Sequence, residues 1–268
     1  PDITAGGSVL TPIKCFGENG TIQFTVNGVK DKGYDYVIRN AANAIIQSAN
    51  NVSETITTIN VTAPQPVGVY TITVTDRKTT CPSTYSVTLS QPAAALAITS
   101  AAATNVNCNN DNSNITVAVT GGTTNYTYAY AKSPSTVPTS VYGNSAVLTV
   151  DTNSGADLVW DVYVKDANDC TAKRKVTVIS DAIPSVTAVV SNPCTASGSN
   201  FTITATGTGG TGTLTYGING AAGAFQAGNT FNVPASATPY TVWVKDGNQC
   251  TASATPITVY PQLTSGAS

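Results

Sequence analysis

One stretch of the chain alternates apolar residues with others at a period of two, and it occurs three times. The copies span residues 70–81, 160–171 and 240–251. In the last copy Tyr240, Val242 and Val244 form the alternating run. Asp246 then opens a polar turn, and Cys250 closes it. The alternation predicts a half-buried strand and the polar cluster predicts a hairpin turn, so the chain is predicted to hold three copies of one domain.

Shorter runs with the same alternation surround this stretch in each copy. In the first copy they are residues 3–13, 21–26, 34–38, 54–61 and 86–89, whereas residues 40–53 are expected to form an irregular insert. Proline ends a strand and cannot donate to its ladder, so Pro92 and Pro184 suit domain junctions. We therefore predict an all-β protein of three tandem immunoglobulin-like (fibronectin-like or PKD-like) β-sandwiches, at residues 1–92, 93–184 and 185–268. Junctions of two or three residues would hold them in an elongated rod.

The charge pattern excludes several classes of partner. Charged residues make up 10% of the 268 residues, the formal net charge is −2, and no basic stripe is present to neutralise phosphates. No apolar run approaches the roughly 18 residues of a membrane span. We therefore expect no nucleic-acid partner and no membrane insertion.

Catalysis has little basis in this sequence. The chain has no histidine, which removes the Ser-His-Asp and Cys-His arrangements. Its two glutamates, Glu18 and Glu54, both lie in predicted turns or edges of the first repeat, where no cleft is predicted. We expect that the protein is not an enzyme.

The six cysteines predict disulfides in an oxidising compartment rather than a zinc site, because no close Cys pair and no His is present. Each repeat has one Cys before its second strand and one after its sixth. The simplest pairing is within repeats: Cys15–Cys81, Cys108–Cys170 and Cys194–Cys250.

A second pairing follows from the geometry of a sandwich, in which these two positions lie at opposite poles and beyond the roughly 7 Å that a disulfide spans. Facing poles of neighbouring repeats would instead join Cys15 to Cys170 and Cys108 to Cys250. Cys81 and Cys194 would then serve further repeats. The sequence leaves both pairings open.

Three aspartates hold the same position in the repeated stretch: Asp76, Asp166 and Asp246. They could bind calcium, helped by Asn168 and Asp169, because hard cations prefer clustered oxygens. The alternative is an Asx-type turn, in which the carboxylate accepts backbone N–H groups. No repeat offers a full acidic ligand set, so we favour the turn and expect no cofactor, with calcium as the alternative.

Aromatic residues recur on both faces of the repeated strand. Tyr70, Trp160 and Tyr240 lie where a sandwich has its tyrosine corner, but Trp160 lacks the hydroxyl, so we expect core packing and no such corner in the second repeat. Tyr163 and Trp243 lie on the opposite face. They could be exposed and stack on sugar rings, although cross-strand pairing is the simpler interpretation.

These motifs together resemble a known family. Gly121-Gly122-Thr123 leads into Tyr126-Thr127-Tyr128, and the unit from Trp160 to Cys170 follows; Gly209-Gly210-Thr211 and the unit from Tyr240 to Cys250 repeat the pattern. The pattern resembles the SprB-type repeat of large cell-surface adhesins of gliding Bacteroidetes. The first repeat departs from it, with Asn27-Gly28 in place of Gly-Gly-Thr and a longer turn before Cys81.

The resemblance implies secretion, display on the outer-membrane exterior and adhesion in service of gliding. The expected function is therefore a non-catalytic structural and adhesive repeat segment of a secreted surface protein. Its expected partners are neighbouring repeats of the same long chain and surface polysaccharide. Two alternatives are accessory carbohydrate-binding modules of an extracellular enzyme and a self-assembling surface layer.

Overall fold

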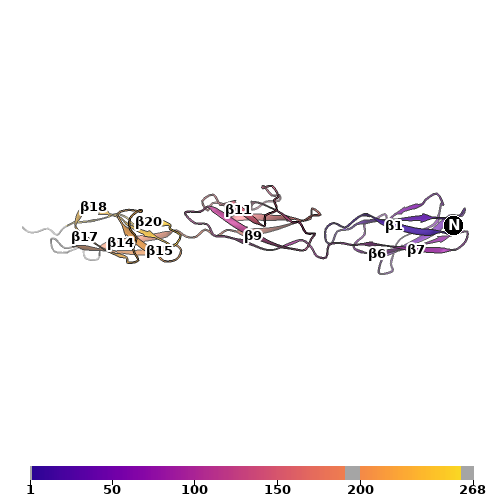
Figure 1. Cartoon of the computed structure of the whole chain (residues 1–268), viewed down its shortest axis with the longest axis horizontal. Coiled ribbons are helices and arrows are strands. Elements are labelled where there is room, and N and C mark those ends of the chain that lie inside the picture. Colours follow the sequence, from indigo (N-terminus) through magenta and orange to yellow (C-terminus); the bar gives the residue numbers. More distant parts are fainter. Residues whose placement is uncertain (1, 191–199, 261–268) are drawn as a thin grey trace, which may run out of the picture.

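The protein forms three groups of β-strands that lie in a row along the longest axis of the molecule (Figure 1). The structure is a computed structural model, and it describes residues 2–190 and 200–260. Every regular element among these residues is a β-strand. The buried apolar side chains of the three groups form separate main clusters, within residues 3–89, 98–178 and 186–259. The limits proposed at residues 92 and 184 each fall between two clusters.

The first repeat is a sandwich of two antiparallel sheets. Its strands are β1 (Thr4–Thr11), β2 (Thr21–Asn27), β3 (Tyr34–Arg39), β4 (Ile45–Val52), β5 (Thr58–Asn60), β6 (Gly68–Asp76) and β7 (Pro82–Leu89). One sheet has the order β1-β2-β5 and the other β4-β3-β6-β7. Alternate residues of β2 and β6, among them Phe24 and Ile72, are fully buried between the sheets. The period-two pattern therefore marks the inner face of each strand.

The second and third repeats follow the same plan. The strands of the second are β8 (Ala97–Ala103), β9 (Asn112–Thr120), β10 (Thr127–Lys132), β11 (Val147–Asp151), β12 (Val159–Lys165) and β13 (Thr171–Thr177). Those of the third are β14 (Pro184–Val190), β15 (Phe201–Gly209), β16 (Thr215–Ile218), β17 (Thr230–Val233), β18 (Ser236–Tyr240), β19 (Val242–Lys245), β20 (Thr251–Ser253) and β21 (Ile257–Val259). Their sheets have the orders β11-β9-β8 and β10-β12-β13, then β14-β15-β17 and β16-β19-β20, with a separate β18-β21 pair.

This strand order defines the fold class. In each repeat the first two strands share a sheet with a later strand. The third strand lies in the other sheet, where it pairs with the aromatic strand: β3 with β6, β10 with β12 and β16 with β19. Such crossing between two antiparallel sheets is the immunoglobulin-like arrangement. The predicted class, an all-β row of immunoglobulin-like sandwiches, is confirmed.

One local prediction is wrong. The expected insert at residues 40–53 contains β4, which pairs with β3 through Tyr36 and Ala49. This edge strand is half exposed along its length, so its sequence lacks the apolar alternation of a buried face. Residues 90–96 and 178–183 connect the repeats from strand to strand. Ala94 accepts from the Gly122 N–H and the Asp181 N–H donates to Val106, so part of each segment is fixed to the second repeat and the stretch between repeats is short, as expected.

Candidate functional site at the junctions between repeats

Two disulfides join neighbouring repeats. Cys15 bonds to Cys170 with their Cα atoms 5.7 Å apart, and Cys108 bonds to Cys250 with their Cα atoms 5.8 Å apart. Each bond connects the loop after the first strand of one repeat to the turn after the aromatic strand of the next. Of the two pairings that the sequence left open, the structure contains the pairing between repeats. Cys81 is a free, exposed cysteine, and the prediction for Cys194 lies outside the described residues.

Hydrogen bonds reinforce the first junction beside its disulfide. The side-chain amide of Asn168 donates to the backbone carbonyl of Lys14 at 3.0 Å and to Thr123 Oγ1 at 2.9 Å. Lys14 belongs to the first repeat, whereas Thr123 and Asn168 belong to the second. Asn168, expected as a calcium ligand, therefore fastens one repeat to the next.

The second junction has an equivalent asparagine. The side-chain amide of Asn109 donates to the backbone carbonyl of Asn248 at 2.8 Å. The side-chain amide of Asn248 donates to Asp181 Oδ2 at 2.9 Å. Asp181 Oδ1 in turn accepts from Asn105 Nδ2 at 2.7 Å. The sequence interpretation missed the roles of Asn109 and Asp181. The signal that was present is the shared position of Asn168 and Asn248, each two residues after the repeated aspartate.

The repeated aspartates are buried and accept backbone N–H groups. Asp166 Oδ1 accepts from the backbone N–H groups of Asn168 and Cys170, and Oδ2 accepts from that of Thr123, each at 2.9 Å. Asp246 is bonded in the same way by Cys250 and Thr211. The carboxylate thus holds the turn that carries each junction cysteine, which is the geometry of the Asx-type alternative.

Asp76 makes the corresponding contacts in the first repeat. Its Oδ2 accepts from the N–H of Lys30 at 2.9 Å, and its Oδ1 accepts from the N–H groups of Lys78 and Thr79 at 2.9 and 2.8 Å. The Lys30 N–H, followed by those of Thr79 and Lys78, lowers the pKa of Asp76 to about 2. The longer turn before Cys81 therefore keeps its carboxylate cap.

The Gly-Gly-Thr motif and the aspartate form one unit. Gly122 has a φ of 62°, and a Cβ there would lie 2.7 Å from Asp166 Oδ2. Glycine is required because it adopts this backbone conformation and leaves room for the carboxylate that binds the next N–H. Gly210 has the same relation to Asp246, with a Cβ distance of 2.8 Å to its Cβ.

The calcium candidates do not form a cluster of acidic side chains. Asp169 is exposed, and its carboxylate pairs with Lys165 Nζ at 3.1 Å. Both oxygens of Asp166 already accept N–H groups. Within residues 2–190 and 200–260, no group of three or more His, Cys, Asp or Glu side chains is placed to hold a metal ion. Calcium binding stays a hypothesis from the sequence.

The aromatic corner exists in all three repeats. The hydroxyl of Tyr70 donates to the carbonyl of Pro66 at 2.7 Å, and that of Tyr240 donates to the carbonyl of Pro234 at 3.0 Å. The expectation that Trp160 cannot serve this role is wrong: its indole Nε1–H donates to the carbonyl of Asp157 at 3.0 Å. A ring N–H replaces the phenol because either group can cap a carbonyl near the start of the strand.

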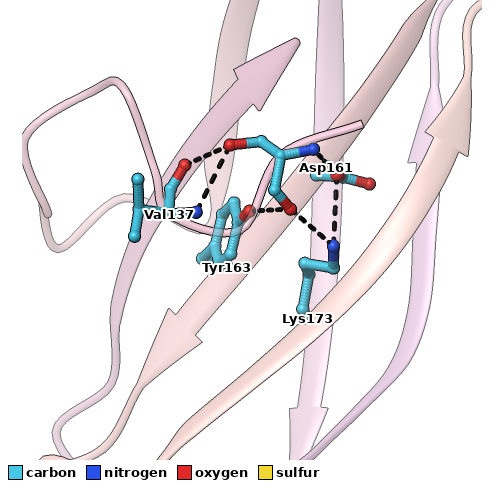
Figure 2. Close-up of polar contacts among 5 residues, drawn as sticks. Val137, Asp161, Tyr163 and Lys173 are labelled. Atoms are coloured by element: carbon cyan, nitrogen blue, oxygen red, sulfur yellow. Dashed lines mark hydrogen bonds and ion pairs between the residues drawn. The ribbon is translucent and has the colours of Figure 1, made fainter. Parts of the chain in front are cut away.

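The structure contradicts the expected exposure of Tyr163, which is only 5% exposed. Its hydroxyl donates to the carbonyl of Ser135 at 2.9 Å, and the segment of residues 133–142 covers the ring (Figure 2). This segment has no counterpart in the period-two pattern, so no sequence pattern predicts that it covers Tyr163. Trp243, at the equivalent position of the third repeat, is half-buried and lines a surface groove.

A buried ion pair holds that covering segment in place. Asp161 Oδ2 accepts from the Ser135 N–H at 2.8 Å and from Lys173 Nζ at 3.2 Å, and Lys173 Nζ also donates to the Ser135 carbonyl at 2.7 Å (Figure 2). Burial raises the pKa of Asp161, but the Ser135 N–H and the Lys173 ammonium outweigh it, so that the pKa lies below its usual value.

Part of the second repeat is similar to a known repeat family. Residues 100–129 match the SprB repeat family. The SprB match runs from within β8 to within β10 and includes Cys108 and the Gly121-Gly122-Thr123 motif. It covers about a ninth of the chain, inside the repeat where the resemblance was clearest.

Solved structures with tandem immunoglobulin domains also resemble the chain. A three-domain immunoglobulin fragment of titin has 11% identity and a TM-score of 0.46, covering 97% of this chain and 99% of its own. The three N-terminal domains of the bacteriophage RB49 highly immunogenic outer capsid protein have 12% identity and a TM-score of 0.41, with the same coverages. We base the fold class on the strand order rather than on these distant likenesses. No curated protein matches the chain.

Proposed function

We propose that the chain is a load-bearing, non-catalytic segment of a large secreted cell-surface adhesin that serves attachment and gliding. The observation that carries this proposal is the pair of disulfides that clamp each repeat to the next. The match of residues 100–129 to the SprB repeat supports the surface role. Disulfides also persist in oxidising compartments, which supports secretion.

The two bridges shorten the path that carries tension through the molecule. A pulling force enters through Cys15, crosses to Cys170, returns along the second repeat to Cys108 and crosses to Cys250. This path holds about 95 residues, against 268 along the backbone, so full extension falls from about 900 Å to about 330 Å at about 3.3–3.6 Å per residue.

The bridges also restrict the unfolded chain. They close loops of 155 and 142 residues. On the chain-entropy model each such loop stabilises the folded state by about 5 kcal/mol, although the two overlap and do not add fully. A segment of this kind resists both forced extension and unfolding.

Cys81 and Cys194 fit the same scheme. Cys81 occupies the turn position that Cys170 and Cys250 use for bridging, and it is exposed and free. In a longer array it would bond to the cysteine of a preceding repeat. Peptide mapping of the non-reduced full-length protein would test this, and a free Cys81 there would contradict it.

Force spectroscopy tests the load-bearing function directly. We expect the oxidised chain, pulled by its ends, to extend to about 330 Å before the covalent limit, and the reduced chain to reach about 900 Å. The control is the variant Cys81→Ser, which should behave like the parent because Cys81 takes part in neither bridge. Equal extension with and without reductant would contradict the proposal.

No helix that could cross a bilayer is present among residues 2–190 and 200–260. The proposed display at the outer-membrane exterior therefore rests on the SprB match and the disulfides alone. In this proposal the partners of the segment are neighbouring repeats of the same chain.

A further inference from the structure

The third repeat has a surface groove that no part of the mechanical role uses. The groove has a volume of about 610 Å³, and Trp243, Tyr240 and Pro239 are among the residues that line it. Its remaining side chains include Asn219, Ser236, Thr238 and Thr241. None of the described residues that line it carries a charge.

Small residues flank Trp243 within its sheet, although on the Gly217 side a Cβ would lie 3.5 Å from the ring of Phe225. Trp243 lies on the outer face of β19, between the buried Val242 and Val244. Its cross-strand partners are Gly217 on β16 and Ser253 on β20, which have little or no side chain. A large ring beside two such small residues can be contacted along its face.

The other repeats carry different residues at this position. In the first repeat it is Thr73, which has no ring and lies opposite Val37 and Thr84. In the second it is Tyr163, whose ring is covered by the chain's own segment around Ser135 (Figure 2). Tyr163 also lines a surface pocket, of about 470 Å³, with Val137 and Tyr142, but its ring is only 5% exposed. The indole of Trp243 is half-buried and lines its groove with a larger exposed part.

We propose that this groove binds the ring of an uncharged sugar in a polysaccharide chain. The C–H face of a sugar ring is apolar and suits the indole of Trp243, and its hydroxyls suit the amide and hydroxyl side chains of the rim. A groove without charge offers nothing to the carboxylates or sulfates of acidic polymers. The volume lies within the range of roughly 300–1,000 Å³ of ligand sites.

The site is independent of the load-bearing function, because the bridges lie at the junctions and Trp243 lies on an outer sheet face. Removal of the indole leaves the apolar core of the third repeat, to which Trp243 does not belong, in place. Failure of either proposal therefore leaves the other standing.

Affinity electrophoresis tests the proposal with polymers of known composition. Gels would contain the neutral polysaccharides laminarin, galactomannan or xylan, or anionic alginate. We expect at least one neutral polymer to retard the parent chain, and Trp243→Ala to weaken that binding roughly tenfold or more. Trp243→Phe should retain part of it, and Thr238→Arg should abolish it by filling the groove without changing the ring.

Tyr260→Ala is the matched control, since Tyr260 is an exposed aromatic residue of the same repeat outside the groove. It should bind like the parent chain. Circular dichroism of each variant confirms that it is folded. The proposal is overturned if no neutral polymer retards the parent, if alginate binds as strongly, or if both Trp243→Ala and Thr238→Arg leave binding unchanged.

Discussion

At the scale of single residues, the repeated aspartate organises each junction pole. Its carboxylate accepts N–H groups from the turn behind it and from the loop that follows the second strand. Charge-assisted bonds of this kind are about twice as strong as neutral ones. One buried side chain therefore fixes both the cysteine-bearing turn and the loop opposite it.

The Asp76 carboxylate should make the first repeat sensitive to acid. Its pKa in the folded state, about 2, lies below the ordinary 3.8, so its stabilising contribution is present in full above about pH 4. The contribution is lost as the pH falls from about 4 through 2. We expect thermal melts of Asp76→Asn to show a lower Tm at pH 7 and a flatter decline between pH 4 and 2.

The control for this comparison is Asp2→Asn, which removes an exposed carboxylate outside the turn. It should retain the acid dependence of the parent chain. An Asp76→Asn variant whose Tm declines as steeply as that of the parent would show that other carboxylates account for the acid sensitivity.

At the scale of elements, equivalent strands carry different surroundings. The outer face of the aromatic strand is bare in the first repeat, covered in the second and open above a groove in the third. In the second repeat the cover depends on Asp161, whose side chain is 1% exposed, and on Lys173, which is 46% exposed. The three repeats share their sheet geometry, and the loops decide whether the outer face of the aromatic strand is covered or accessible.

Loss of Lys173 should loosen the covering segment. Lys173→Met leaves the buried carboxylate of Asp161 with the Ser135 N–H alone. We expect a loss of about 1–2 kcal/mol, less than the 3–5 of a fully buried pair because the lysine is half exposed. Denaturant unfolding measures the change.

Lys78→Met is the comparison, since its partner Asp31 is also exposed and such surface pairs contribute about 0–1 kcal/mol. A Lys173→Met variant no less stable than Lys78→Met would show that the ion pair does not hold the cover.

At the scale of the whole molecule, the row of repeats is held by two kinds of connection at each junction. One connection is the backbone, through residues 90–96 and 178–183, in which Ala94 and Asp181 are hydrogen-bonded to the second repeat. The disulfide at each junction adds a second covalent link on another side, and Asn168 and Asn248 add hydrogen bonds beside it. Two links at different points limit bending where one linker would allow it.

The variant Cys15→Ser/Cys170→Ser tests this geometry. We expect small-angle scattering to show a shorter mean length and a broader distribution of shapes, because the first two repeats then pivot about residues 90–96. The parent chain with Cys81→Ser is the control. If the scattering curves of the double variant and of the control coincide, the linker and the asparagine contacts alone fix the angle between the first two repeats.

The sequence alone determined the strands with one buried face and the three copies of the domain. Each of these follows from local spacing, because the period of two and the position of Asp and Cys after Val244 or Val164 are read along the chain. In the sequence, the uncovered Trp243 and the covered Tyr163 cannot be told apart, because both hold the same position in the repeated strand. The within-repeat and between-repeat cysteine pairings cannot be told apart either.

Only the tertiary structure decided between these, because the contacts join residues far apart in sequence. Cys15 and Cys170 meet only once two sandwiches stand pole to pole, and Ser135 reaches Tyr163 only through a loop without regular pattern. The half-exposed strand β4 was missed for the related reason that an edge strand buries neither face fully. Local alternation specifies where a strand forms. Which repeats face each other, which loop covers a strand and which strand lies at a sheet edge depend on how the strands are placed in space.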